Sequence, residues 1–186
     1  MMNRLITSVF FSLTIIITSS CQHAVGTDKS IQSSSAQIGL NIGNIAPEIT
    51  LPDADGKNIS LSSLHGKIVL IDFWASWCPP CRAESPDLVQ AYNHFKEKTF
   101  KGGKGFTIYS ASLDRAKDSW LKAINDDHLS WATHVSDLKY WKSSVVELYQ
   151  IQGIPMNFLI DEKGVIIAKS LRREALYEAL TALEIK

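Results

Sequence analysis

The eight residues Trp-Ala-Ser-Trp-Cys-Pro-Pro-Cys at positions 74–81 follow directly on an apolar run, Ile68–Phe73. Such a run is typical of a fully buried β-strand, so the two cysteines stand where a strand gives way to a helix. A helix start presents unpaired backbone N–H groups and the positive end of the helix dipole, and both stabilise a thiolate. We therefore predict that Cys78 is an exposed nucleophile and that Cys81, one turn further in and more buried, is the resolving cysteine.

Two other roles for the cysteine pair are weaker. A structural disulfide stabilises most when it closes a long loop, and this pair encloses only two residues. A zinc site needs four ligands, usually a second cysteine pair or closely spaced histidines. No such spacing is seen among His65, His94, His128 and His134. We therefore expect redox chemistry with no metal and no bound cofactor.

Asp72 is a lone carboxylate in the otherwise apolar strand that precedes the cysteines. Burial of a carboxylate is costly unless the group is useful or well hydrogen-bonded, and desolvation raises its pKa. Our hypothesis is that Asp72 lies beneath the dithiol and takes the proton of Cys81 when that thiol becomes a nucleophile. The alternative is a carboxylate at a strand end that faces water.

Apolar periodicity and turn residues outline the other elements. Pro155 precedes an apolar run and cannot donate a sheet hydrogen bond, which fits the first residue of a strand. Asp114 is placed to cap a helix. Alternating strands and helices followed by a hairpin predict an α/β fold, with a central mixed sheet flanked by helices on both faces. The expected elements are a hairpin at 49–61, strands at 67–73 and 106–113, helices around 88–95 and 120–124, an amphipathic stretch at 140–149, a hairpin at 156–168 and a helix around 176–183.

The first twenty residues differ from the rest of the chain. Arg4 is their only charged residue, and the mostly apolar stretch Leu5–Ile17 is too short to span a membrane. Residues 1–20 are therefore predicted to be a signal peptide. Small residues lead into Cys21, as in the lipobox of bacterial lipoproteins, and Cys21 is predicted to be lipidated. A secreted form cleaved nearby and a chance cysteine are the alternatives.

A Ser-rich stretch follows this cysteine, and residues 21–40 are predicted to be a lipid anchor and flexible linker ahead of a folded domain at 41–186. The whole chain carries 19 basic and 19 acidic residues. This balance, without a basic tail, argues against a nucleic-acid partner. Export would place the pair of cysteines in a compartment where disulfides persist.

The residues around the motif resemble the thioredoxin superfamily, in particular its exported TlpA and ResA branch. The resemblance is carried by Asp-Phe-Trp-Ala at 72–75, Trp77–Cys81, Pro86 and Gly153–Pro155. It implies a buried acid at Asp72, a cis peptide bond before Pro155, an added N-terminal hairpin, and an inserted segment at about 114–152. It also implies a partner-binding surface formed by Trp77, Pro79, Ile154 and Pro155. The chain departs from the usual pattern at Arg82, where lysine is common, and at Met156, where threonine is common.

The resemblance implies an exported, membrane-anchored thiol:disulfide oxidoreductase. It would act as a reductase of exported protein disulfides, for example in cytochrome c maturation, and would receive electrons from a membrane donor of the thiol:disulfide transporter type. The expected location is the periplasm-facing side of a bacterial cell envelope.

Two other functions stay open. A peroxiredoxin-type thiol peroxidase shares the fold, but Ile71 and Ala75 stand where its motif has proline and a hydroxyl residue. A non-catalytic binding lipoprotein is the third possibility. An aromatic lip over the site could select partners, although core packing is the expected role of its candidate residues, Trp120, Trp131, Tyr140 and Trp141.

Overall fold

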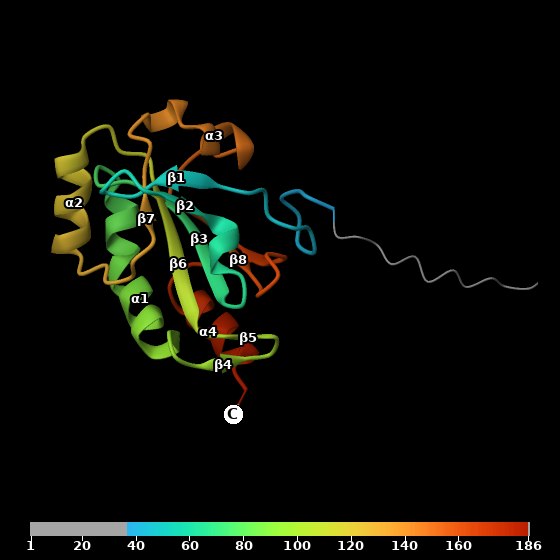
Figure 1. Ribbon diagram of the computed structural model, residues 1–186. Coiled ribbons are helices and arrows are strands. Elements are labelled where there is room, and N and C mark those ends of the chain that lie inside the picture. Colours follow the sequence, from blue (N-terminus) through green and yellow to red (C-terminus); the bar gives the residue numbers. More distant parts are fainter. Residues whose placement is uncertain (1–36, 186) are drawn as a thin grey trace, which may run out of the picture. The chain divides into compact units, whose positions relative to one another are not determined.

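The computed structural model describes residues 37–185 of the 186-residue chain. The predictions for the signal peptide and for lipidation of Cys21 lie outside these residues. Within the described part, a five-stranded mixed sheet forms the centre, as predicted (Figure 1). Helices, short helical turns and a small hairpin surround it, and two further short strands, β4 (Thr99–Phe100) and β5 (Gly103–Lys104), pair beside it.

The sheet has the strand order β7-β6-β3-β8-β9. Its central strand β3 (Ile68–Trp74) runs parallel to β6 (Phe106–Ser112) and antiparallel to β8 (Met156–Ile160). The edge strand β7 (His134–Val135) is parallel to β6, and the opposite edge β9 (Ile166–Lys169) is antiparallel to β8. Every residue of β3 and β6 is buried, which explains why their sequences are continuous apolar runs.

Three helices lie on one face of the sheet. Helix α1 (Pro79–Phe95) connects β3 to β6, and helix α2 (Lys117–Asp126) connects β6 to β7. Right-handed crossovers between successive parallel strands place both helices on the same side. Helix α4 (Glu174–Leu183) packs beside α1, where the rings of Phe95 and Tyr177 are 4.8 Å apart. Helix α1 therefore packs against both the sheet and α4.

The other face of the sheet is covered by the predicted N-terminal hairpin and by short helices. Strands β1 (Thr50–Pro52) and β2 (Asn58–Ser60) pair antiparallel, and the Tyr109 hydroxyl of β6 donates to the Ile59 carbonyl at 2.8 Å. Tyr149 packs on Phe73 of β3 with ring centroids 4.9 Å apart. The remaining elements here are η1 (Leu61–Leu64), η2 (Tyr140–Lys142) and α3 (Ser144–Leu148), and Tyr149 is the C-cap of α3.

The last residues of the predicted linker contact the folded domain. The Gly39 backbone N–H donates to the Ile45 carbonyl, and the Ile45 N–H donates to the Gln37 carbonyl, both at 3.0 Å. The Lys169 ammonium donates to the Leu40 carbonyl at 2.9 Å. Residues 37–40 are thus joined to the domain by hydrogen bonds.

The expectation that Asp114 caps a helix is wrong. Helix α2 begins at Lys117, and its N-cap is Ala116. The Asp114 carboxylate instead accepts hydrogen bonds from the Ser76 backbone N–H at 2.9 Å and from the Ser112 hydroxyl at 2.6 Å. Because the Ser76 hydroxyl also donates to it, at 2.5 Å, Asp114 fixes the loop immediately before the cysteine pair.

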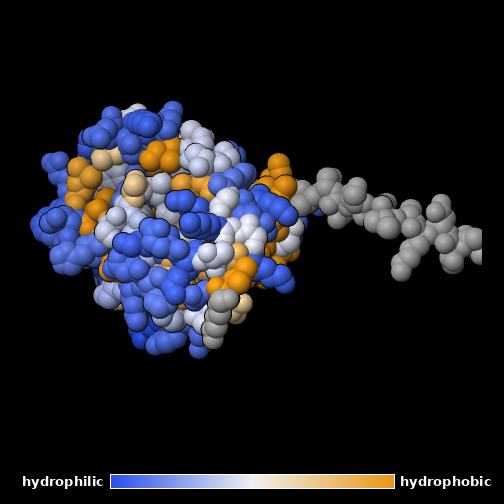
Figure 2. Space-filling model, turned by 60° about the horizontal axis from the view of Figure 1, so that its bottom comes forward, coloured by the Kyte–Doolittle hydropathy of each residue, from blue (hydrophilic) through white to orange (hydrophobic). Residues whose placement is uncertain are grey.

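The face of the domain that Figure 2 shows is mainly hydrophilic, with small, separate apolar patches. Among residues 37–185, no helix is long and apolar enough to cross a membrane. The exposed large hydrophobic side chains of the described residues are Ile38, Ile42, Trp77, Leu121, Leu148 and Ile185.

Buried His134 is expected to make folding stability depend on pH. Its ring stacks on Trp131 with centroids 5.1 Å apart, and a ring nitrogen lies 3.1 Å from the Leu129 carbonyl oxygen. Burial lowers the pKa of His134 from 6.5 to about 4. The unfolded chain therefore binds a proton between these pH values that the folded chain does not, and stability falls as the pH drops through this window.

The His134→Phe variant keeps an aromatic ring but cannot titrate. The free energy of unfolding can be measured by chemical denaturation at pH 7 and at pH 4. From pH 7 to pH 4, wild type should lose about 3 kcal/mol more of this free energy than the variant does. A difference in free energy of unfolding between the two proteins that does not change with pH would contradict the lowered pKa of His134. The comparison with a variant is needed because the raised pKa of Asp72 makes stability change with pH in the opposite direction.

Candidate active site

The two cysteines form a disulfide at the start of α1, as the sequence predicted. Cys78 is the N-cap of the helix, and its Sγ accepts from the Cys81 backbone N–H at 3.2 Å. Pro79 and Pro80 occupy the first helical positions and have no N–H, so Cys81 supplies the first backbone donor of the helix. The helix start therefore directs its first N–H at the sulfur of Cys78.

The expected contrast in exposure between the cysteines is absent. Both residues are only 4% exposed. Cys78 is covered because the loop before β8 lies over it, with the Ile154 carbonyl oxygen 3.7 Å from its Sγ. The Ile154–Pro155 peptide bond is cis, which agrees with the resemblance. Pro155 directly precedes β8, and Met156 is its first residue.

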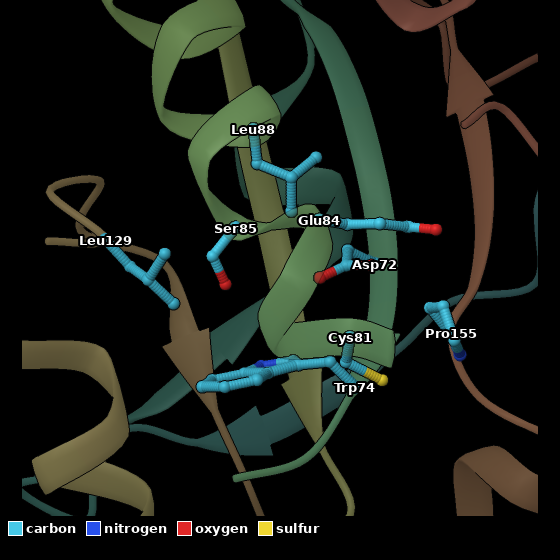
Figure 3. A pocket seen from close by; sticks show the side chains of 8 residues that line it. All are labelled: Asp72, Trp74, Cys81, Glu84, Ser85, Leu88, Leu129 and Pro155. Atoms are coloured by element: carbon cyan, nitrogen blue, oxygen red, sulfur yellow. The ribbon is translucent and has the colours of Figure 1, made fainter. Parts of the chain in front are cut away.

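Asp72 lies beneath the cysteine pair, as predicted. It is 4% exposed and lines a cavity of about 10 Å³ together with Cys81 and Pro155. In Figure 3 the side chain of Asp72, from β3, lies between those of Glu84 and Cys81, both from α1, and Pro155 stands to the right. The alternative of a carboxylate that faces water is therefore excluded. The other residues that line this cavity are Trp74, Glu84, Ser85, Leu88 and Leu129.

The pKa of Asp72 is raised from 3.8 to about 7, chiefly by burial and then by the nearby charge of Glu84, while the charge of Arg172 acts in the opposite direction. A carboxyl group with this pKa is present in both protonation states near neutral pH. It can therefore accept and return a proton where thiol exchange takes place.

Glu84 and Arg172 are the site residues that sequence reasoning missed. The Nε atom of Arg172 lies 3.2 Å from Glu84 Oε1. Glu84 follows Cys81 by three residues on one helix, so helical spacing alone places the two side chains on neighbouring positions of one face. Arg172 comes from the loop after β9, and no local pattern in the sequence connects it to the cysteines.

Arg82 binds Asp127 through two hydrogen bonds. Its Nη2 donates to Asp127 Oδ1 at 2.6 Å, and its Nε donates to Oδ2. The Ser85 hydroxyl donates to the same Oδ2 at 2.8 Å. A forked contact of this kind suits arginine and cannot be made by lysine, so it accounts for the departure at position 82.

Trp77 lies at the surface beside Cys78 and is 41% exposed. Its indole N–H donates to the Leu113 carbonyl at 3.2 Å, and its ring centroid is 5.0 Å from Tyr140 and 6.3 Å from Trp141. Tyr140 and Trp141 therefore form a partly buried aromatic cluster with Trp77 beside the active site. Trp141 also packs against the hydrophobic core, so the expectation of core packing is wrong only for Tyr140. It is confirmed for Trp120 and Trp131, which are buried.

The geometry can support two-electron exchange between the cysteine pair and a disulfide. Among residues 37–185, no cluster of histidine, cysteine, aspartate or glutamate could hold a metal ion. The site thus consists of the cysteine pair, a buried acid beneath it and a proline loop above it.

Comparison with known proteins supports this description. A model of the AhpC/TSA family matches residues 42–169. The thiol-disulfide oxidoreductase ResA of Bacillus subtilis is 30% identical over 128 residues, which cover 69% of this chain and 66% of that protein. Two solved structures are similar over 77% of this chain. The thioredoxin domain of a thiol-disulfide oxidoreductase from Bacteroides vulgatus is 42% identical with a TM-score of 0.69 and is covered over 98% of its length. A thiol:disulfide interchange protein from a Bacteroides species is 41% identical with a TM-score of 0.67 and is covered over 90%.

The fold, the cysteine pair and these relatives define an enzyme of the thioredoxin superfamily that carries out thiol-disulfide exchange. The chain belongs to the AhpC/TSA family, and it is a thiol-disulfide oxidoreductase similar to the ResA proteins.

Peroxidase activity is expected to be negligible. Ile71 and Ala75, at the positions where a peroxidase carries proline and a hydroxyl residue, are fully buried apolar side chains. The reduced protein should react with hydrogen peroxide no faster than an ordinary thiolate, because no hydroxyl at these positions can hold the peroxide. Stopped-flow tryptophan fluorescence measures this rate, and rapid, saturating oxidation of Cys78 would reinstate the peroxidase function.

Proposed function

We propose that the protein is an exported reductase of protein disulfides that is anchored to a membrane through Cys21. The observation that carries the exchange chemistry is the buried carboxyl of Asp72, which lines one cavity with Cys81, whereas the reductase direction is supported by the resemblance. A proton acceptor at this place serves the step in which the Cys81 thiol must become a nucleophile. That step completes the reduction of a partner.

The proposed cycle starts from the reduced pair. The Cys78 thiolate attacks a partner disulfide, forms a mixed disulfide and releases one partner thiolate. The Cys81 thiol then gives its proton to the Asp72 carboxylate, and its thiolate attacks Cys78 Sγ. The second partner thiolate leaves, and the Cys78–Cys81 disulfide forms. Two electrons pass from the enzyme to the partner, and solvent protonates the released thiolates.

The clients that we propose are disulfides of exported proteins, such as the cysteine pair of an apocytochrome c. A membrane donor of the thiol:disulfide transporter type would return two electrons to the oxidised pair. These proposals are supported by the resemblance to the exported branch of the superfamily and by the short apolar stretch and Cys21 in the sequence.

The direction of exchange can be tested on an oxidised peptide that contains Cys-x-x-Cys-His, the haem-attachment sequence. The reduced enzyme should open this disulfide stoichiometrically in a single turnover, measured by mass spectrometry after acid quenching. The opposite result, with the oxidised enzyme closing the reduced peptide in preference, would make the protein a disulfide donor.

The anchor can be tested by metabolic labelling with a radioactive fatty acid. Wild type should take up the label and sediment with membranes, whereas Cys21→Ser should do neither, because a lipid chain supplies the membrane affinity. An unlabelled wild-type protein in the soluble fraction would refute the lipoprotein proposal and leave the exchange chemistry intact.

A further inference from the structure

Arg172 contacts both sides of the active site. Its Nε lies 3.2 Å from Glu84 Oε1 on α1, and its Nη2 donates a hydrogen bond to the Pro155 carbonyl. Its Nη1 donates to the Leu171 carbonyl at 3.1 Å. One guanidinium group therefore joins the active-site helix to the cis-proline loop that covers Cys78.

The loop that carries Arg172 is itself fixed to the sheet. The Asn157 side chain donates to the Leu171 carbonyl at 2.7 Å and accepts from the Leu171 backbone N–H at 2.8 Å. Asn157 is 1% exposed and is the register partner of Asp72 on the neighbouring strand. Because the backbone beside it is anchored in this way, the contacts of Arg172 need little further ordering of the backbone.

We propose that Arg172 is a positioning residue of the exchange reaction with two separable effects. It holds the cis-proline loop against the active-site helix, where a partner chain must dock. Its positive charge also favours the ionised carboxylate of Asp72, the form that accepts the proton of Cys81. This inference rests on the exchange chemistry at the cysteine pair and holds for either direction of electron flow.

The charges around the buried acid support the second effect. Arg172 lowers the pKa of Asp72, whereas Glu84 on α1 raises it. Glu84 itself has a pKa raised by burial, and Arg172, followed by Arg173, acts against that rise, while Asp87 adds to it. Without Arg172, Glu84 would lose its ion-pair partner, and the positive charge that lowers the pKa of Asp72 would be gone.

The contact geometry supports the first effect. The guanidinium makes contacts in different directions, to a carboxylate and to two backbone carbonyls, and its planar fork fits that arrangement. Lysine at this position would keep the charge but could not reproduce these contacts. The two effects can therefore be separated by substitution.

The test compares three variants with wild type: Arg172→Met, Arg172→Lys and, as a control for an exposed neighbouring charge, Arg173→Met. The probe is the oxidised Cys-x-x-Cys-His peptide, with resolution followed in single turnovers across pH 5 to 9 and with KM measured at pH 7. In Arg172→Met the midpoint of the pH profile should rise by about half to one unit, less than the roughly 1–3 units of a fully buried charge pair, because Arg172 is partly exposed. Its KM should also rise, by about tenfold, for loss of a charge-assisted hydrogen bond.

Arg172→Lys should restore the midpoint to within error of wild type but keep the raised KM, and Arg173→Met should match wild type in KM. An unchanged midpoint in Arg172→Met, or a loss of rate that is equal at every pH, would overturn the electrostatic effect. An unchanged KM in both Arg172 variants would overturn the positioning effect. If wild type oxidises the reduced peptide instead, the proposed direction fails, and the same three variants measured in that direction still decide the role of Arg172.

Discussion

Cys81→Ser is expected to trap the protein as a covalent complex with its partner. Cys78 remains able to attack a disulfide, since the helix start that stabilises its thiolate is retained, including the Cys81 backbone N–H that points at its sulfur. The mixed disulfide then has no resolving thiol. Non-reducing gel electrophoresis of the variant should show a stable adduct with the Cys-x-x-Cys-His peptide, and turnover should fall by several orders of magnitude, to the background rate of free thiols.

Cys78→Ser is the matched control, because it removes one sulfur from the same pair. This variant should lose exchange activity without forming an adduct, since the nucleophile itself is absent. An adduct through Cys81 in Cys78→Ser, or normal turnover by either variant, would contradict the assignment of the two roles. In cells, the trapped adduct of Cys81→Ser would also name the natural partner.

Asp72→Asn is expected to slow the resolution step while leaving the fold intact. Asparagine has nearly the shape of the buried carboxyl but cannot accept the proton of Cys81. At pH 7 the step should be slower by about 10-fold to 100-fold, at or below the lower end of the range for general acid-base catalysis, because the wild-type carboxyl is only partly ionised there. The wild-type rate should rise with pH through a midpoint of about 7, and the variant should lack this limb.

Folding stability gives an independent readout of the same group. The pKa of Asp72 is raised from 3.8 to about 7 in the folded protein, so the folded state holds a proton that the unfolded chain releases. Stability contributed by the neutral carboxyl is complete below pH 3.8 and is lost as the pH rises through 7. The free energy of unfolding of Asp72→Asn, compared with that of wild type, should therefore rise by about 4 kcal/mol between pH 4 and pH 8. A resolution rate equal to wild type at pH 7 would remove Asp72 from the mechanism, whatever its effect on stability.

The chemistry of the site could be predicted from the sequence because it depends on local patterns. The apolar run before the cysteines is the buried strand β3, and the charged residue within it is the buried acid. The cysteine spacing placed the pair at a helix start, where the structure shows it. The hairpins and the C-terminal helix also follow from short-range turn signals and apolar spacing.

The parts that could not be predicted depend on contacts between distant segments. Arg172 reaches the site only because β9 returns beside β8, and Asp114 turns to Ser76 and Ser112 because these serines lie close to it in the fold. Cys78 is covered by a loop 76 residues further along the chain. Tyr140 and Trp141 had the composition of core residues, and only their position next to Trp77 shows that they border the site.

The reduction potential of the Cys78–Cys81 pair tests the central claim most directly. The purified protein would be equilibrated with a series of dithiothreitol or glutathione redox buffers, and the fraction of reduced thiols measured by alkylation and mass spectrometry. A reductase requires a potential near or below roughly −270 mV, the thioredoxin value, and this is the result we predict. A potential towards roughly −120 mV would make the protein a disulfide donor, and a pair that does not cycle at all would contradict the assignment as an oxidoreductase.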